Sequence, residues 1–269
     1  MRLTEEHLLL RLSDFSNKYR SSTSMSFQTK PLLSIIIPTL NEGDNIGPTL
    51  DSVMKLGADI EVVLVDGGST DQTVEIARAY GARVIRSERG RGTQMHRGAC
   101  ESQGTVLWFL HADTMVPAGS PDSVNASLQD ESVIAGNFEV RFGGELRAAR
   151  FMTWLYPRLR RLGLCYGDSA IFVRRNAYFE AGGFKSFPIF EDLDLLRKLK
   201  KMGSFVHLPL NVITSPRRFA GRSFVLMFTR WVALQCLYWL GVSPTRLGRL
   251  YGAHGAAEND RKARETSSA

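Results

Sequence analysis

The chain has 269 residues, of which 43% are hydrophobic, so it can form one large α/β domain or two small ones. Its net charge of +7 indicates an anionic partner, and nucleic acid, a membrane surface or a phosphorylated substrate would be suitable. Cys100, Cys165 and Cys236 are spaced neither as a disulfide framework nor as metal ligands, which excludes a disulfide-rich secreted domain and predicts core thiols in a cytoplasmic protein.

Residues 1–31 are expected to form an N-terminal extension before the folded domain. Three leucines at 8–10 are too short an apolar run for a signal peptide. Residues 4–16 can form a short amphipathic helix, and residues 21–30 are typical of a polar linker. The folded domain should therefore start near residue 32.

Apolar runs alternate with helical patterns from residue 33 to residue 110, which predicts a parallel sheet built from βαβ units. The first run is apolar throughout and predicts a central strand. A polar loop at 39–42 leads into the first helix, which Gly57 stops. The predicted strands are residues 33–37, 62–65, 83–85 and 105–110, and the predicted helices run through residues 46–56, 74–80 and 93–100.

The second strand ends in Asp66-Gly67-Gly68, a sequence typical of a nucleotide-binding turn. Ligands of open α/β sheets bind at the carboxyl ends of strands, and the glycines let a ligand approach the backbone. Ser69 and Gln72 have the spacing of a capping box, which predicts a helix N-terminus beside the carboxylate of Asp66. The alternative is a capped turn that binds nothing.

Polar segments also follow the third and fourth strands. Residues 87–92 form a basic, glycine-rich loop whose Arg91 can contact phosphate or lie in a solvated turn. His111 and Asp113 alternate along an extended segment, so both can face one side. Imidazole and carboxylate there would suit a divalent cation, whereas the alternative for Asp113 is a cap on the next turn.

The chain changes character in its second half. Residues 138–142 alternate like a strand with one exposed face, residues 147–162 are basic and aromatic, and residues 170–173 predict another apolar strand. Glu191 and Asp192 precede a helix with leucines on its buried face. Either the helix dipole stabilises these two carboxylates, or one of them is a general base that faces a cleft.

Four of these motifs stand in a recognisable order: Ile37-Pro38-Thr39-Leu40-Asn41-Glu42, Val65 to Asp71, His111-Ala112-Asp113 and Glu191-Asp192. Together they resemble glycosyltransferase family 2 over residues 32–220. The resemblance implies the α/β GT-A fold, with a nucleotide-sugar half at 32–116 and a mixed acceptor half at 117–220. Residues 89–95, 109–114 and 214–219 more closely resemble a bacterial subgroup sometimes linked to arsenosugar biosynthesis.

The resemblance implies transfer of a sugar from a nucleotide-diphosphate sugar, with Mn²⁺ or Mg²⁺ held by Asp113 and by His111, which replaces the first Asp of the family's D-x-D motif. Asp192 matches the base that deprotonates the acceptor, and Glu191 is the next candidate. Ser169 stands where the resemblance leads us to expect Gln. Nucleotide-sugar binding is implied for Pro38, Thr39, Asn41, Glu42, Asp66, Gly67, Ser69, Arg91, Ala112, Arg217 and Arg218.

Carboxylates at Asp66 and Glu42 would accept a hydrogen bond from a ring N–H, which favours UDP or GDP over CDP. The acceptor is left open between phosphorylated and lipid-linked molecules. A nucleotidyltransferase is an alternative, but the loop at 39–42 lacks the expected glycines and basic residues. A nucleic-acid-binding protein is a further alternative, although it leaves the cleft carboxylates unexplained, so we expect no nucleic-acid partner.

Residues 221–269 are expected to form an apolar helix and a polar tail. The apolar run at 224–240 contains Arg230 and Gln235. Because a charge in mid-bilayer costs about 2.5–3.5 kcal/mol, we expect a helix that does not span a membrane. It can pack on the domain, lie in a homodimer interface, or lie in the plane of an anionic membrane.

Overall fold

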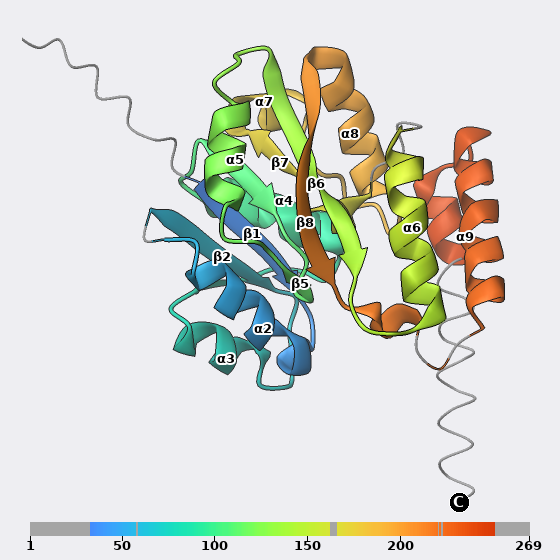
Figure 1. Ribbon diagram of the computed structural model, residues 1–269, viewed down its shortest axis with the longest axis horizontal. Coiled ribbons are helices and arrows are strands. Elements are labelled where there is room, and N and C mark those ends of the chain that lie inside the picture. Colours follow the sequence, from blue (N-terminus) through green and yellow to red (C-terminus); the bar gives the residue numbers. More distant parts are fainter. Residues whose placement is uncertain (1–32, 58, 162–165, 220, 222, 251–269) are drawn as a thin grey trace, which may run out of the picture. The chain divides into compact units, whose positions relative to one another are not determined.

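The computed structural model describes residues 33–57, 59–161, 166–219, 221 and 223–250. The expected N-terminal extension, the polar tail and Cys165 lie outside these residues. Within them, eight strands form one mixed sheet in the order β3-β2-β1-β4-β7-β6-β8-β5 (Figure 1). The strands are β1 (Leu33–Thr39), β2 (Ile60–Asp66), β3 (Arg83–Arg86), β4 (Val106–Phe109), β5 (Thr114–Met115), β6 (Val133–Phe142), β7 (Phe172–Arg174) and β8 (Ser204–Thr214).

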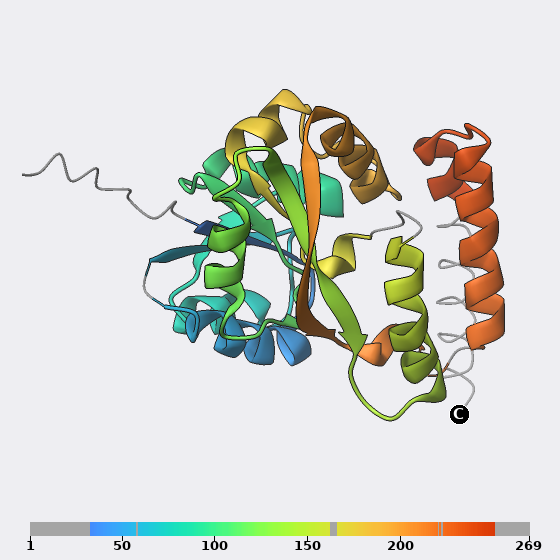
Figure 2. The ribbon, with the colours of Figure 1, turned by 45° about the horizontal axis from the view of Figure 1, so that its top comes forward.

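Helices cover both faces of this sheet (Figure 2). Side chains alternate across β1, so Ile35 packs with the helices on one face and Ile36 with those on the other. Helices α2 (Gly43–Met54), α3 (Thr73–Ala79), α5 (Ser120–Ser127) and α6 (Arg147–Arg161) share a core with the first face. Helices α4 (Arg91–Glu101), α7 (Arg175–Glu180) and α8 (Glu191–Met202) share a core with the second.

The predicted parallel sheet is confirmed in the first half, where β1 pairs in parallel with β2 and β4, and β2 with β3. The second half is mixed, as expected, because β7 is antiparallel to both of its neighbours. No predicted strand covers β8, although it is the longest, with 11 residues. Pro209 interrupts its pattern and lies where the pairing with β6 shifts register.

Helix α9 spans Phe224–Trp239, and the described residues 244–250 are helical as well. None of the helices in the described part of the chain has both the length and the apolar composition of a membrane span. The expectation of buried cysteines is wrong for Cys100 and Cys236, which are exposed with free thiols. Cys100 lies on the outward side of α4 and Cys236 on the outward side of α9. An apolar side chain at such a position can remain exposed to solvent.

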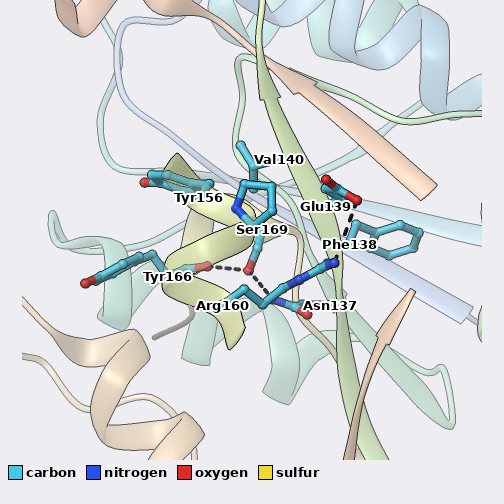
Figure 3. A pocket seen from close by; sticks show the side chains of 9 residues that line it. Asn137, Phe138, Glu139, Val140, Tyr156, Arg160, Tyr166 and Ser169 are labelled. Atoms are coloured by element: carbon cyan, nitrogen blue, oxygen red, sulfur yellow. Dashed lines mark hydrogen bonds and ion pairs between the residues drawn. The ribbon is translucent and has the colours of Figure 1, made fainter. Parts of the chain in front are cut away.

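A buried polar network fixes the 3₁₀ turn η1 (Gly167–Ser169) against the sheet (Figure 3). The Ser169 hydroxyl donates to the Tyr166 carbonyl and accepts a hydrogen bond from Asn137 at 2.9 Å. The other end of the Asn137 amide lies 2.6 Å from Nδ1 of His207. The adjoining cavity measures about 10 Å³, which suits one water molecule and no substrate. Ser169, at the position where Gln is expected, therefore stabilises the turn η1 through its hydrogen bonds.

Candidate active site

A cleft of about 360 Å³ opens at the edge of the sheet where β1 and β4 end. Parallel strands bring their carboxyl ends to one edge, which is where ligands of such sheets bind. Nine of the residues predicted from the sequence line it. They are Pro38 and Thr39 at the end of β1, Glu42 after it, Arg91 at the start of α4, His111, Ala112 and Asp113 after β4, and Arg217 and Arg218 in the 3₁₀ turn η2 (Pro216–Phe219).

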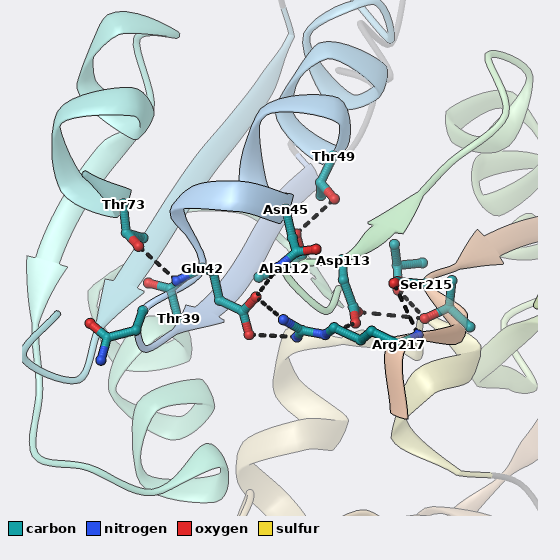
Figure 4. A network of polar contacts seen from close by, with 12 residues as sticks. Thr39, Glu42, Asn45, Thr49, Thr73, Ala112, Asp113, Ser215 and Arg217 are labelled. Atoms are coloured by element: carbon teal, nitrogen blue, oxygen red, sulfur yellow. Dashed lines mark hydrogen bonds and ion pairs between the residues drawn. The ribbon is translucent and has the colours of Figure 1, made fainter. Parts of the chain in front are cut away.

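Arg217 connects the two carboxylates at the mouth of the cleft (Figure 4). Its terminal nitrogens donate to both oxygens of Glu42 at 2.6 Å, and its Nε donates to Asp113 at 3.1 Å. The hydrogen bonds to Glu42 raise the pKa of Arg217. Since the Arg217 side chain is 45% exposed, the pairing is screened by water and can be exchanged for a ligand.

The loops that follow β1 and β2 are tied to one another. Asn41 adopts a left-handed backbone conformation, with φ of 55°, and its backbone N–H donates to the Ser69 hydroxyl at 2.9 Å. The backbone N–H of Glu42 donates to the Thr73 hydroxyl at 2.8 Å. These bonds correct the capping-box prediction, because Ser69 binds the neighbouring loop and α3 begins only at Thr73. They hold Glu42 at the cleft.

Asp66 is 2% exposed and does not line the cleft. Its carboxylate accepts hydrogen bonds from the backbone N–H groups of Gly68, at 3.2 Å, and Ser69, at 2.9 Å. The capped-turn interpretation therefore describes what Asp66 does in this structure. Behind the turn, the buried Gln94 side chain donates to the carbonyls of Thr39 and Val65, both at 2.8 Å. Sequence reasoning missed Gln94, although it lies within the motif at 89–95.

Phe190 precedes Glu191 and Asp192 in the left-handed region, with φ of 64° and ψ of 22°. This conformation is unfavourable for a bulky residue and requires support from its surroundings. The Phe190 ring packs on Tyr238 of α9, with 4.9 Å between the ring centroids, and on Leu234. The C-terminal helix therefore supports the backbone turn that presents the two carboxylates.

The two carboxylates differ in their partners. Glu191 is 1% exposed and forms an ion pair with Nε of Arg91. Burial raises the pKa of Glu191, while the charge of Arg91 opposes that rise. The Asp192 carboxylate accepts hydrogen bonds only from backbone N–H groups among its described contacts, those of Gly167 at 2.5 Å and Leu193 at 2.8 Å. Glu191 thus orients a cleft arginine, whereas the Asp192 carboxylate is held by backbone N–H groups alone among the described residues.

Asp168 is a further buried carboxylate close to Asp192, Arg91 and Arg218. Its Oδ2 accepts a hydrogen bond from the Tyr156 hydroxyl at 2.7 Å and lies 3.7 Å from Arg218. Its Oδ1 is buried with no hydrogen-bond partner in the described part of the chain. Burial raises the pKa of Asp168, and the charge of Arg218 opposes that rise. The sequence patterns considered above assign no role to Asp168.

His111 lies near Gly167 of η1 as well as at the end of its own strand. A Cβ atom built on Gly167 would lie 3.5 Å from Nε2 of His111 and 3.2 Å from Oδ2 of Asp192. Burial, followed by the charge of Arg91, lowers the pKa of His111 well below its ordinary value. The imidazole is therefore neutral at physiological pH. Its Nε2 is buried and has no hydrogen-bond partner among the described residues.

Asp113 and His111 offer a pair of metal ligands rather than a cage. No group of three His, Cys, Asp or Glu side chains that could hold a metal occurs in the described residues. Asp113 Oδ1 has only a distant contact, 3.5 Å from the Thr214 hydroxyl, and the neutral Nε2 of His111 is unpaired. Mg²⁺ in phosphate sites is typically bound by one or two carboxylates together with the substrate. These residues therefore fit a cation shared with a diphosphate.

Comparison with known proteins gives a consistent result. Residues 34–187 match the model for "Glycosyl transferase family 2". A "PGL/p-HBAD biosynthesis glycosyltransferase" of Mycobacterium bovis is 34% identical over 171 residues, which are 57% of this chain and 63% of that protein. A "Glucosyl-3-phosphoglycerate synthase" of Mycolicibacterium paratuberculosis is 34% identical over 96 residues, which are 32% of this chain and 29% of that protein. The chain thus spans less than two thirds of these relatives.

Solved structures share the fold at lower identity. Glucosyl-3-phosphoglycerate synthase from Mycobacterium tuberculosis, in complex with Mn²⁺, UDP and glucosyl-3-phosphoglycerate, has a TM-score of 0.54 at 22% identity, covering 79% of this chain and 81% of that chain. A mannosyltransferase from Pyrobaculum calidifontis, in complex with GDP-Man and Mn²⁺, has a TM-score of 0.54 at 17% identity, covering 76% of this chain and 63% of that chain. The expected GT-A fold is confirmed.

Proposed function

Since the chain belongs to glycosyltransferase family 2, we propose that it transfers a sugar from a nucleotide-diphosphate sugar to an acceptor hydroxyl. One observation supports this function above all. A single cleft brings Arg91, Arg217 and Arg218 together with Asp113, and Asp192, which does not line this cleft, is bonded to Gly167, beside the cleft residue His111. This is the charge distribution that a departing diphosphate and an incoming hydroxyl require.

The reaction is a single displacement with inversion. The acceptor oxygen attacks the anomeric carbon, the bond to the diphosphate oxygen breaks, and Asp192 takes the hydroxyl proton. Arg217 and Arg218 stabilise the negative charge that develops on the diphosphate, and Arg91 is held toward the cleft by Glu191. General-base assistance of this kind contributes about 10²–10⁴-fold to the rate.

Asp113 and His111 would hold Mn²⁺ or Mg²⁺. When bound, such a cation neutralises charge on the diphosphate. The Mn²⁺ in the two related structures described above favours this assignment. Arg217 would then move from Asp113 to the diphosphate.

The donor is a UDP-sugar or a GDP-sugar, as in the relatives solved with UDP-GlcNAc and GDP-Man. In this structure Asp66 and Glu42 already have partners, so base recognition by their carboxylates would require Glu42 to release Arg217. Asn41, Gly67 and Ser69 would shape the turn beneath the nucleoside. The acceptor stays open between phosphorylated and lipid-linked molecules, and the arsenosugar subgroup and the cytoplasmic location stay predictions.

A thermal-shift screen of UDP-, GDP- and CDP-sugars, each with and without Mn²⁺, tests the proposed function. Binding to the native state raises the melting temperature by an amount that grows with the ratio of ligand to Kd. We expect the largest rise for a UDP- or GDP-sugar with Mn²⁺, and we expect Asp113→Asn to abolish the Mn²⁺ contribution. Asp122→Asn, on the exposed side of α5, is the control. A screen without any Mn²⁺-dependent rise would contradict the function, and a largest rise with a CDP-sugar would contradict the base preference.

A further inference from the structure

Helix α9 exposes an apolar stripe along its whole length. Val225 and Leu226 are each 70% exposed at its start, and Trp239 and Leu240 are 60% and 80% exposed at its end. Val232, Ala233 and Cys236 continue the stripe at helical spacing. A surface helix of a globular protein normally carries polar residues on this side.

The two polar side chains that could interrupt the stripe both donate hydrogen bonds to backbone carbonyls. The Thr229 hydroxyl donates to the Val225 carbonyl at 2.9 Å, so its hydrogen-bonding capacity is used within the helix. Arg230 is half-buried, and its guanidinium donates to the Leu250 carbonyl at 3.0 Å. The stripe therefore presents almost no polar group to its surroundings.

The neighbouring helix α6 adds a second stripe of different composition. Its exposed positions, again at helical spacing, are Arg147, Arg150, Phe151, Trp154, Arg158 and Arg161. The guanidinium of Arg158 lies over the Trp154 ring, 3.7 Å from its centroid. Phe151 joins the two helices through edge-on contacts with Phe224 and Phe228, and both ribbon views show α6 and α9 side by side (Figures 1 and 2).

Charge on these two helices has one sign. Neither residues 146–161 nor residues 216–250 contain an aspartate or a glutamate. Arg246 and Arg249 are also exposed beyond the end of α9. Aromatic and basic side chains around an apolar helix face are the composition of helices that lie in a membrane interface.

We propose that the α6–α9 face, made of these two stripes, binds the surface of an anionic lipid bilayer with α9 in the plane of the interface. The apolar stripe enters the boundary between headgroups and acyl chains, and the α6 arginines contact the anionic headgroups. Charge complementarity favours this occupant over a second copy of the chain, because symmetric pairing would bring arginines of equal sign together. Binding of lipid is independent of the proposed transferase activity.

Flotation of the full chain tests this directly. We expect it to float with vesicles of phosphatidylcholine and phosphatidylglycerol at low salt, and to float much less with phosphatidylcholine alone. A double variant, Leu226→Ser with Leu240→Ser, should reduce the partition coefficient by about ten-fold or more, because it removes buried apolar area. The double variant Arg150→Gln with Arg158→Gln should reduce only the electrostatic component of vesicle binding, which is the component that depends on salt and on phosphatidylglycerol.

Matched controls lie on another face of the molecule. Tyr80→Ser removes an exposed aromatic residue next to α3, and Arg78→Gln removes an exposed arginine of α3. Neither should change flotation, and equal melting temperatures will show that every variant folds. The inference is overturned if the chain does not bind the anionic vesicles, or if the α6–α9 variants bind as the controls do. It is equally overturned if the chain is a dimer that the Leu226 and Leu240 variants dissociate without any vesicle binding.

Discussion

The guanidinium of Arg217 donates to the carboxylate of Asp113 at 3.1 Å, so the residue proposed for the diphosphate is paired with the residue proposed for the cation. A diphosphate in the cleft would attract Arg217 and leave Asp113 available to a metal ion. Nucleotide and cation should therefore increase each other's affinity, and by linkage the two increases must be equal.

Arg217→Gln should change the affinity for the cation and the affinity for the nucleotide in opposite directions. Without nucleotide, Mn²⁺ should bind the variant several-fold more tightly, because Asp113 loses its paired positive charge. The nucleotide-diphosphate, in contrast, should bind about ten-fold more weakly, because a bidentate contact is lost. Isothermal titration calorimetry measures both affinities, with Arg78→Gln as the exposed control. Unchanged Mn²⁺ affinity would mean that Asp113 does not hold the cation.

Asp192→Asn should lower kcat by about 10²-fold or more and leave donor affinity nearly unchanged, because only the proton acceptor is removed. The amide oxygen can still accept the Gly167 N–H, so the turn should survive. Glu191→Gln should act differently, since it frees Arg91 and so weakens donor binding. Steady-state kinetics with the donor varied distinguish the two. A fully active Asp192→Asn variant would transfer the role of base to Glu191.

Gly92→Ala should destabilise the fold by about 1–3 kcal/mol, since an added Cβ forces a close contact. That Cβ would lie 2.2 Å from the carbonyl of Lys185 and 3.3 Å from Glu191. The shift would also disturb Arg91, so donor affinity should fall with stability. Gly119→Ala is the control, because its Cβ meets nothing within 4 Å. Urea unfolding of both variants measures the difference, and equal stabilities would contradict the packing described for α4.

The free energy of unfolding should fall as the pH drops from 6.5 to 4, because of the protonation of His207. Burial, with the charges of Arg160 and Lys200, lowers the pKa of His207 to about 4. A lowered pKa in the folded state means that the stabilisation is fully present above pH 6.5 and is lost as the pH falls through 4. Because the His207 side chain is exposed and its charge is screened by water, the change should be only about 1 kcal/mol. Urea unfolding at several pH values should show this component, and His207→Gln should remove it.

Much of the nucleotide half could be predicted from the sequence. Strands β1, β2 and β4 are mostly apolar and buried, and each leads into a polar motif, so periodicity and motif position agree. The resemblance placed Glu42, Arg91, Asp113 and Arg217 in one site, and the structure brings these four residues to one cleft.

The rest depends on contacts that local patterns do not contain. Ser69 has the correct spacing for a cap, but a loop 28 residues away takes its hydroxyl. Gln94 and Asp168 act through partners on other elements, and β8 follows a bulged register around Pro209 that no alternation predicts. The exposure of Cys100 and Cys236 likewise depends on which side of each helix meets the core.

The support that α9 gives to the left-handed Phe190 bears on where a functional fragment of this chain can end. The segment that matches the family model stops at residue 187, before Asp192 and the whole of α9. A fragment cut after η2 would keep every carboxylate and arginine named at the site and yet lose Leu234 and Tyr238, which hold the strained turn. A functional fragment should therefore extend at least to the end of α9.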